Sequence, residues 1–291
     1  MKTETRMPEH SVLLLPIGGI IVRHAEKGNR IMGTVETFRL KIAPLKQGPR
    51  TVYVYLPDGY EESTEDYPVL YMFDGHNLFF DDLATYGKSW GIKDYLDACH
   101  LPLIVVGQDC NHTGDMRLFE YCPFPAEEGS WFPEGKVLGA ITADWFAHTL
   151  KPACEKRYRI RKGREHTGIA GSSMGGLMSI YCISEYNALF SKAACLSSTM
   201  DITLDATLNH IRTSSVSPDT RIYLDFGSKE LGPKKEFALA VDRMLQINHA
   251  FQEHHCNTFP NVVVGGKHSE ETWKTIVPLF LNYLFPELYG E

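Results

Sequence analysis

The chain has 291 residues, of which 43% are hydrophobic and 22% are charged, the composition of a globular protein that buries a large core rather than of a disordered chain. Its formal net charge is -7, which disfavours binding to nucleic acids and to anionic membranes. Seven cysteines are scattered singly, without a CxxC pair. This pattern is typical of a reducing compartment, so we expect a cytoplasmic protein.

The apolar run at residues 11–22 is the one segment that resembles a signal peptide. Glu4 and Glu9 precede it where a basic region would stand, and Pro16-Ile17-Gly18-Gly19 interrupts it. The run is also too short to span a bilayer. We therefore expect neither secretion nor membrane insertion.

Two hydrophobic patterns divide the rest of the chain. Residues 34–57 alternate apolar and polar side chains, which predicts antiparallel strands with one face toward solvent. Further on, short apolar runs alternate with helical stretches, which predicts parallel strands linked by helices. We expect one α/β domain over residues 1–291, with a mostly parallel sheet, antiparallel N-terminal strands and helices on both faces. The expected strands are 69–73, 103–106, 167–170, 192–196, 222–226 and 262–264, with helices at about 90–99 and 174–186.

Residues 109–138 break this rhythm. The segment is rich in aromatic residues, proline and glycine around Pro123-Phe124-Pro125 and Trp131-Phe132-Pro133. Loops of this length without regular structure are usually functional. We expect a lid-like insertion.

Gly171-Ser172-Ser173-Met174-Gly175 stands between an expected strand and an amphipathic helical pattern. In that context a Gly-x-Ser-x-Gly turn holds its central serine in a strained conformation above the sheet, and its neighbours two residues away must be small. The motif predicts an α/β-hydrolase with Ser173 as the nucleophile.

A serine nucleophile needs a histidine base and an acid, which follow it in this fold in the order serine, acid, histidine. His268 lies just past an expected strand, whereas His249, His254 and His255 lie in a polar helical stretch and are expected at the surface. His254-His255-Cys256 lacks a second, suitably spaced ligand pair, so we expect no metal site there.

For the acid, Glu230 follows the end of the preceding strand, where the histidine loop can reach it. Asp225 lies within that strand and is the alternative. Glu270 and Glu271 begin the last helix, where acids are favoured without any catalytic role.

The oxyanion of an acyl-transfer intermediate needs two backbone donors. Met174 N–H, directly after the nucleophile, is expected to supply one. The other is expected from His76 N–H in Asp74-Gly75-His76-Asn77, where Gly75 permits a sharp turn. The side chain of His76 is assigned no role.

Taken together, these motifs are similar to those of the "putative esterase" family of α/β-hydrolases, which includes enterochelin-type siderophore esterases, feruloyl and acetylxylan esterases and esterase D-like proteins. The matching stretches are 50–57, 67–79, 117–121, 171–176 and 268–273. The resemblance implies Ser173 as nucleophile, Glu230 as acid and His268 as base. His76 replaces a glutamine common in relatives, and the segment before residue 34 is too short for the extra N-terminal domain of full enterochelin esterases.

We therefore expect a serine carboxylic-ester hydrolase that forms an acyl-enzyme, needs no cofactor or metal, and acts on a small soluble or carbohydrate-linked feruloyl or acetyl ester. A siderophore trilactone esterase and an acyltransferase with the same triad remain alternatives. Oligomeric state stays open. The expected pocket wall is Trp90, Arg117, Glu120 and Tyr121.

Overall fold

The computed structural model describes residues 11–14, 20–23, 32–43, 45 and 48–290. The apolar run at 11–22 lies partly outside these residues. Among the helices that are described, none combines the length and the apolar character needed to cross a membrane.

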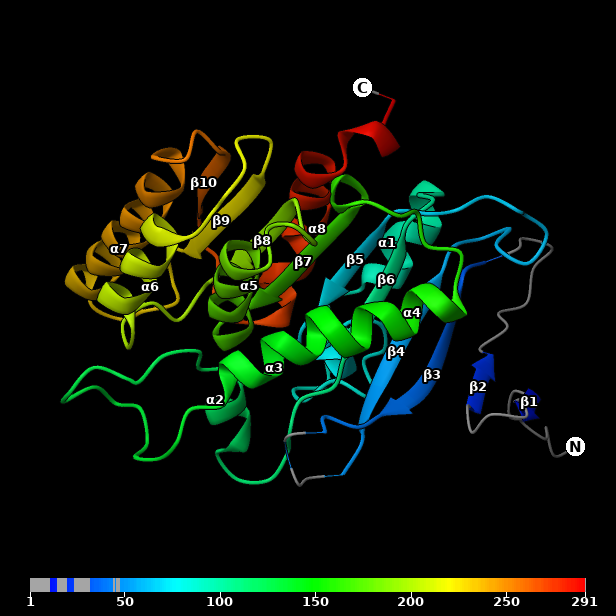
Figure 1. Ribbon diagram of the computed structural model, residues 1–291, viewed down its shortest axis with the longest axis horizontal. Helices are drawn as coiled ribbons and strands as arrows, with labels where there is room; N and C mark the ends of the chain where they lie inside the picture. The colour runs from blue at the N-terminus through cyan, green and yellow to red at the C-terminus, as the bar shows by residue number, and fades with distance from the viewer. Residues whose placement is uncertain (1–10, 15–19, 24–31, 44, 46–47, 291) are drawn as a thin grey trace, which may run out of the picture.

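Within the described residues a ten-stranded sheet forms the centre of the molecule (Figure 1), in the order β1-β2-β3-β4-β6-β5-β7-β8-β9-β10. β1 to β4 and the β4/β6 pair are antiparallel, and the remaining neighbours are parallel. This confirms the predicted mostly parallel sheet with antiparallel N-terminal strands, and β1 and β2 extend its antiparallel part. The strands are β1 (Ser11–Leu14), β2 (Ile20–Arg23), β3 (Thr34–Leu40), β4 (Arg50–Leu56), β5 (Val69–Met72), β6 (Ile104–Gln108), β7 (Thr167–Ser172), β8 (Lys192–Leu196), β9 (Arg221–Gly227) and β10 (Asn257–Val263).

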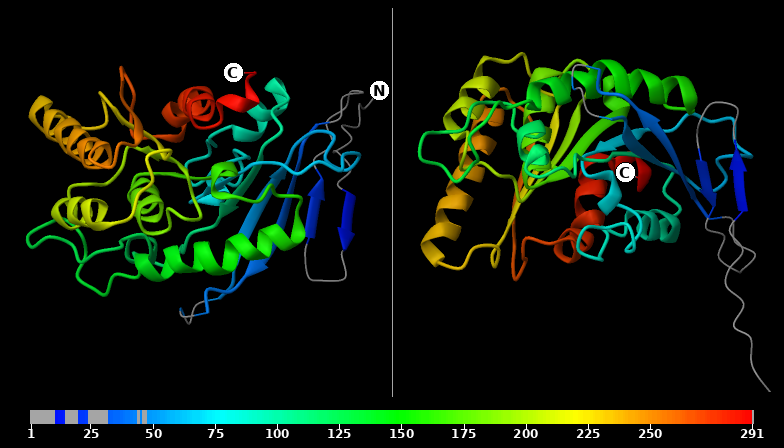
Figure 2. Two further views of the ribbon diagram at one scale, coloured as in Figure 1. Left: turned by 45° about the horizontal axis from the view of Figure 1, so that its top comes forward. Right: turned by 90° about the horizontal axis from the view of Figure 1, so that it is seen from below.

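Helices cover both faces of the sheet (Figure 2). On one face lie α3 (Gly139–Trp145), α4 (Lys151–Arg157), α5 (Met174–Glu185), α6 (Leu204–Thr213) and α7 (Lys234–Gln252), and a π-helical turn, Phe146–Leu150, joins α3 to α4. On the other face lie α1 (Ile92–Cys99) and α8 (Glu270–Leu284). The short α2 (Met116–Glu120) and the 3-10 helices Gly75–Asn77, Arg164–His166 and Pro286–Leu288 complete the described helices.

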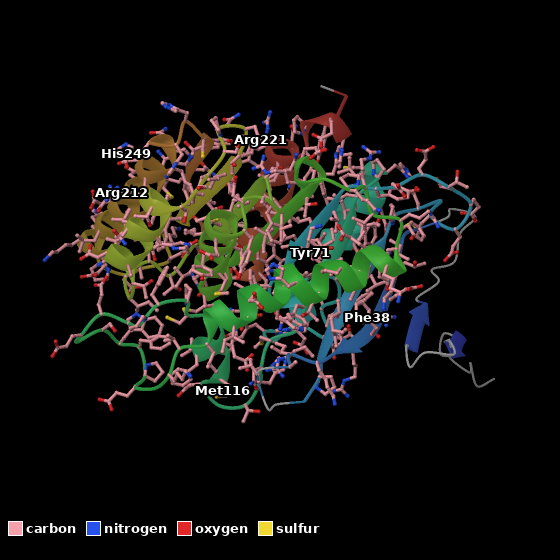
Figure 3. All side chains as sticks on the ribbon, viewed as in Figure 1. Phe38, Tyr71, Met116, Arg212, Arg221 and His249 are labelled. Atoms are coloured by element: carbon pink, nitrogen blue, oxygen red, sulfur yellow. The ribbon has the colours of Figure 1, made fainter. Side chains whose placement is uncertain are left out.

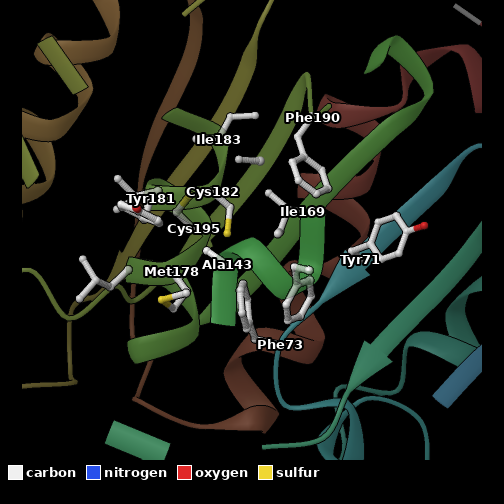
Figure 4. Packing of buried hydrophobic residues seen from close by; sticks show 14 of the residues in the cluster. Tyr71, Phe73, Ala143, Ile169, Met178, Tyr181, Cys182, Ile183, Phe190 and Cys195 are labelled. Carbon is white, nitrogen blue, oxygen red and sulfur yellow. The ribbon is translucent and has the colours of Figure 1, made fainter. Parts of the chain in front are cut away.

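Strand periodicity divides the core into two layers. Along β5, the side chains of Val69 and Tyr71 enter the layer under α3 to α7, while Leu70 and Met72 enter the layer under α1 and α8. Tyr71 lies at mid-sheet in Figure 3, and Figure 4 shows it in the first layer. One detail differs from expectation: every residue of α5 from Met174 to Ser184 is buried, because α3 and α6 pack against this helix. It is a core helix rather than an amphipathic one.

The segment 109–138 contains one short helix, α2, which begins at Met116 (Figure 3). Two of its aromatic rings pack inward: Phe124 lies 5.4 Å from the Tyr181 ring, and the Phe132 ring lies 5.5 Å from Phe119. Trp131, by contrast, is 56% exposed.

Candidate active site

Ser173 occupies a sharp turn between the last residue of β7 and the first residue of α5. Its backbone lies at φ 57° and ψ −123°, a region that non-glycine residues rarely adopt and that clusters at functional sites. The turn leaves no space on its inner side, because a Cβ added to Gly171 would lie 2.7 Å from the carbonyl carbon of Gly175. The bend therefore requires Gly171, and at Gly175 an added Cβ would lie 3.0 Å from Phe73 Cβ, so both positions favour glycine, as the motif predicts.

His268 and Glu230 meet at the ends of β10 and β9. Nδ1 of His268 lies 2.7 Å from Oε2 of Glu230. The other carboxylate oxygen, Oε1, accepts hydrogen bonds from the Gly227 amide and the Ser197 hydroxyl, each at 2.6 Å. The Glu230 side chain is only 1% exposed, while that of His268 is 43% exposed. A buried carboxylate thus orients an imidazole that substrate can reach.

Trp273, in the first turn of α8, supports the same pair. Its indole Nε1–H donates to Ser197 Oγ at 3.0 Å, and its ring packs edge-on against the His268 ring with centroids 5.1 Å apart. Ser197, Glu230 and His268 therefore form a hydrogen-bonded chain with Trp273 at its inner end.

The alternative acid, Asp225, uses its carboxylate for other partners than His268. Its carboxylate accepts hydrogen bonds from the Ser197 amide at 3.0 Å and the Tyr223 hydroxyl at 3.1 Å. Burial raises the pKa of Asp225 to about 7, against the effect of these two donors. Glu270 is also buried, at the start of α8, and burial raises its pKa. Neither arrangement orients an imidazole.

The histidines of the α7 region are likewise apart from Ser173. His249 is exposed on α7, and His254 Nε2 contacts the Ile211 carbonyl oxygen at 2.8 Å. Their placement agrees with the prediction of a surface role.

Two cavities open beside Ser173. One has a volume of about 370 Å³ and the other about 400 Å³, and both are lined by Arg117, Ser173 and His268. The first also has apolar walls at Leu118, Met200, Phe226, Leu231 and Trp131. The second has mainly polar walls, including Asn77, Thr85, Asn111 and His112. Ser173 Oγ itself contacts Thr199 Oγ1 at 3.3 Å.

Two turns at the site carry backbone amides that have no partner within the turn. Met174 is the first residue of α5, and the first amides of a helix have no partner within it. In the 3-10 turn Gly75–Asn77 the first hydrogen bond runs from Asn77 N–H to the Asp74 carbonyl, so His76 N–H has no partner within its turn. A Cβ at Gly75 would lie 2.4 Å from the Gly107 carbonyl oxygen, which explains the glycine there.

Of the four residues predicted to form the pocket wall, the structure places Arg117 beside both cavities. Its Nε and Nη2 donate to the two carboxylate oxygens of Asp74 at 2.8 and 2.6 Å. Burial acts to raise the pKa of Asp74, but the charge and hydrogen bonds of Arg117 outweigh it and the pKa is lowered. This ion pair fixes the turn that carries His76.

The other three predicted wall residues lie in the interior, which corrects the prediction for them. Trp90 is 3% exposed and packs on Trp273. Glu120 is fully buried and accepts two hydrogen bonds from Arg50 Nη2, at 2.7 and 2.8 Å. Tyr121 is fully buried, and its hydroxyl donates to Gln108. Burial of the aromatic rings and the buried ion pair between Arg50 and Glu120 account for all three positions.

Sequence reasoning missed several residues that the structure brings to the site: Ser197, Thr199, Trp273 and the apolar wall residues Leu118, Met200, Phe226 and Leu231. Ser197 to Thr199 directly follow a predicted strand, β8, and strand ends near the nucleophile are where ligands bind in such sheets. Their position after β8 could therefore have identified Ser197 and Thr199 as site residues from the sequence. For Trp273 nothing in the local sequence distinguishes a core residue from one that supports the histidine.

This chain is similar to several other proteins in sequence and to several solved structures in fold. The uncharacterized protein YbbA of Bacillus subtilis is 28% identical over 64% of this chain and 70% of its own. Esterase Rv1288 of Mycobacterium tuberculosis is 29% identical over 49% of this chain, but over only 28% of its own length. Among solved structures, a ferulic acid esterase superposes with a TM-score of 0.64 at 19% identity, covering 88% of this chain and 98% of that one.

The enterobactin and salmochelin hydrolase IroE superposes with a TM-score of 0.62 at 16% identity, covering 90% of this chain and 97% of that one. At these identities the two structures share the α/β-hydrolase fold with this chain. The family described as "Putative esterase" matches residues 45–278, which is most of the sequence. The chain belongs to this esterase family of carboxylic-ester hydrolases.

Proposed function

We propose that the chain hydrolyses carboxylic esters through an acyl-enzyme, with Ser173 as nucleophile, His268 as general base and Glu230 as the orienting acid. One observation carries the proposal: His268, joined to Glu230 at 2.7 Å, lines the same two cavities as a serine held at φ 57°. A serine alone is a weak nucleophile, and this pair is the group that activates it.

The contact with Glu230 selects the tautomer of the neutral His268 ring in this proposal. With Nδ1–H donated to Glu230, Nε2 carries the lone pair that accepts the Ser173 proton as Oγ attacks the ester carbonyl. The carbonyl π electrons move to oxygen, and the amides of Met174 and His76 donate to that oxyanion. The intermediate collapses, the alcohol leaves with the proton from His268, and a water repeats the sequence to release the acid.

The apolar cavity is the proposed acyl pocket. Trp131 and Phe226 supply aromatic faces beside Ser173, and a volume of about 370 Å³ is at the lower end of the range for small-molecule sites. Aromatic walls of this kind stack on a hydroxycinnamoyl group. We propose a small soluble or carbohydrate-linked ester, feruloyl or acetyl, which agrees with the shared fold of the ferulic acid esterase.

The polar cavity is the proposed site of the alcohol part. Its amide and hydroxyl side chains, Asn77, Thr85 and Asn111, are donors and acceptors suited to a carbohydrate. The 109–138 segment contributes Arg117, Leu118 and Trp131 to the walls and is the lid of the single domain in this proposal. The scattered single cysteines favour the cytoplasm in this proposal.

The test measures hydrolysis of p-nitrophenyl acetate, p-nitrophenyl butyrate, methyl ferulate and a catecholate trilactone by the wild-type protein, Ser173→Ala and Ser172→Ala. Ser172 is the matched control, because it is the adjacent hydroxyl but precedes the bend. We expect Ser173→Ala to lose all turnover and Ser172→Ala to retain most of it. Turnover that survives in Ser173→Ala contradicts the assignment.

The preferred substrate then decides the acyl class. Faster cleavage of methyl ferulate supports the aromatic acyl pocket. Faster cleavage of the trilactone supports siderophore hydrolysis instead; IroE is named as an enterobactin and salmochelin hydrolase. Products analysed with and without added alcohol separate hydrolysis from acyl transfer, since a transferase forms the new ester in place of the free acid.

A further inference from the structure

Four side chains with metal-binding atoms meet at one edge of the polar cavity. His76, Asp109, Cys110 and His112 each direct one ligand atom into a group in which all four atoms lie within 4.8 Å of one another. His76 belongs to the turn after β5, and the other three follow β6. These strands are parallel neighbours, so their carboxyl ends bring the two loops together.

The His76 ring and the Cys110 thiol are the buried members of the cluster, and the ring has a nitrogen without a hydrogen-bond partner. Its side chain is 7% exposed, and Nε2 contacts Thr85 Oγ1 at 2.9 Å. Nδ1 is buried without a hydrogen-bond partner, although it lies 2.8 Å from Asp109 Oδ1, because that contact lacks hydrogen-bond alignment. An imidazole that donates one N–H to an outer oxygen and presents the other nitrogen is arranged as in metal sites.

The remaining atoms stand near the same point. Asp109 Oδ1 also lies 2.9 Å from Nε2 of His112, so one carboxylate oxygen touches both imidazoles. A tetrahedral ion with bonds of about 2.0 to 2.1 Å separates neighbouring ligand atoms by about 3.3 Å. The contacts at 2.8 and 2.9 Å therefore have to open by about 0.4 to 0.5 Å, and atoms as far apart as 4.8 Å have to approach by up to about 1.5 Å. The His112 side chain, 58% exposed, is the member with most room to move.

We propose that His76, Asp109, Cys110 and His112 bind a divalent transition-metal ion of the Zn²⁺ class. Two imidazoles, a thiolate and a carboxylate form a ligand set suited to Zn²⁺, whereas Ca²⁺ and Mg²⁺ select oxygen ligands. Binding requires the Cys110 thiol to release its proton to solvent. The ion takes no part in the ester chemistry of this proposal.

The position of the site gives the ion a structural consequence. Metal bonds would tie the turn of His76, whose amide is the proposed oxyanion donor, to the loop at 109–112. That loop leads into α2 and Arg117, which holds the same turn through Asp74. An ion here would stiffen one wall of the site.

The experiment titrates chelator-treated full-length protein with Co²⁺, then displaces it with Zn²⁺. Cobalt reports a four-coordinate site through its visible bands and a thiolate ligand through a sulfur-to-cobalt band in the near ultraviolet. The cluster variants are Cys110→Ser and His112→Ala. The matched controls are Cys99→Ser, an exposed cysteine, and His249→Ala, an exposed histidine on α7 (Figure 3).

We expect one equivalent of Co²⁺ in the wild-type protein and both controls. We expect at least tenfold weaker binding in His112→Ala, and loss of the sulfur band in Cys110→Ser. Absence of stoichiometric binding in the wild type overturns the proposal, as does equal affinity in His112→Ala and His249→Ala. Because the His112 side chain is exposed, we expect His112→Ala to fold. This variant therefore tests the proposal even if Cys110→Ser does not fold.

Discussion

The substitution Glu230→Gln removes the negative charge of the acid but keeps the size of its side chain. The structure predicts which tautomer of His268 this variant has. Oε1 of Glu230 accepts from the Gly227 amide at 2.6 Å, and a backbone N–H can only donate. The glutamine must therefore place its carbonyl oxygen there and its amide NH₂ at the position of Oε2, 2.7 Å from His268 Nδ1. A donor at that point forces the proton of His268 onto Nε2.

In that tautomer Nε2 has no lone pair for the Ser173 proton. The equivalent charge removal in a Ser-His-Asp enzyme lowers kcat by about 10⁴. At about 1.4 kcal/mol per tenfold, the loss corresponds to about 5 kcal/mol of activation free energy. We expect kcat/KM on p-nitrophenyl acetate to fall by about three to four orders of magnitude.

Asp225→Asn is the control, since Asp225 is the competing acid and lies in the same buried region. Its activity should stay within about tenfold of the wild type, because Asp225 contacts no ring nitrogen of His268. Circular dichroism and melting temperature establish that both variants fold. A loss below tenfold in Glu230→Gln, or an equal loss in the two variants, refutes the reasoning.

Three further outcomes follow. Ser197→Ala removes one hydrogen-bond donor to Glu230 and the acceptor for the Trp273 indole. We expect kcat to fall about 10- to 100-fold with KM nearly constant. An unchanged kcat argues against a positioning role for Ser197. Burial raises the pKa of Asp225 to about 7 from 3.8, so the folded state binds the extra proton and the free energy of unfolding should decrease from pH 4 to pH 7. Urea unfolding at pH 5 and pH 8 should show a smaller difference in Asp225→Asn than in the wild type, and equal differences exclude this source. Trp131→Ala should lower kcat/KM for methyl ferulate about 2- to 10-fold more than for p-nitrophenyl acetate; parallel losses on both esters remove Trp131 from the acyl pocket.

Local sequence patterns predicted the architecture because each expected element has a strong periodic signal. The runs at 69–73 and 192–196 are continuous and apolar, as buried parallel strands require, and appear as β5 and β8. The bend at Ser173 was predictable for a different reason. Its glycines are imposed by contacts within a few residues, such as the approach of Gly171 to Gly175, so the cause lies inside the motif.

The residues of the pocket wall could not be predicted from local sequence patterns. Which of them line the pocket depends on which side of a loop faces the sheet. Tyr121 and Trp131 both lie in an aromatic, irregular segment, yet Tyr121 is fully buried and Trp131 is 56% exposed. Glu120 looks like a surface acid by composition, but its partner Arg50 lies 70 residues earlier, on β4. Nothing in the neighbouring sequence tells the buried Tyr121 from the exposed Trp131, or shows that Glu120 is paired in the interior.

Sheet order explains why the remaining parts of the site converge. The nucleophile turn follows β7, the turn of His76 follows its neighbour β5, and on the opposite side Ser197, Glu230 and His268 follow β8, β9 and β10. The donor turn therefore stands on one flank of Ser173 and the acid and base on the other, in the chain order that the fold requires. The same adjacency of β5 and β6 places His76 against residues 109–112, more than 30 positions away. A cluster formed by two neighbouring strand ends leaves no motif in the sequence, and for that reason the four ligand types became visible only in three dimensions.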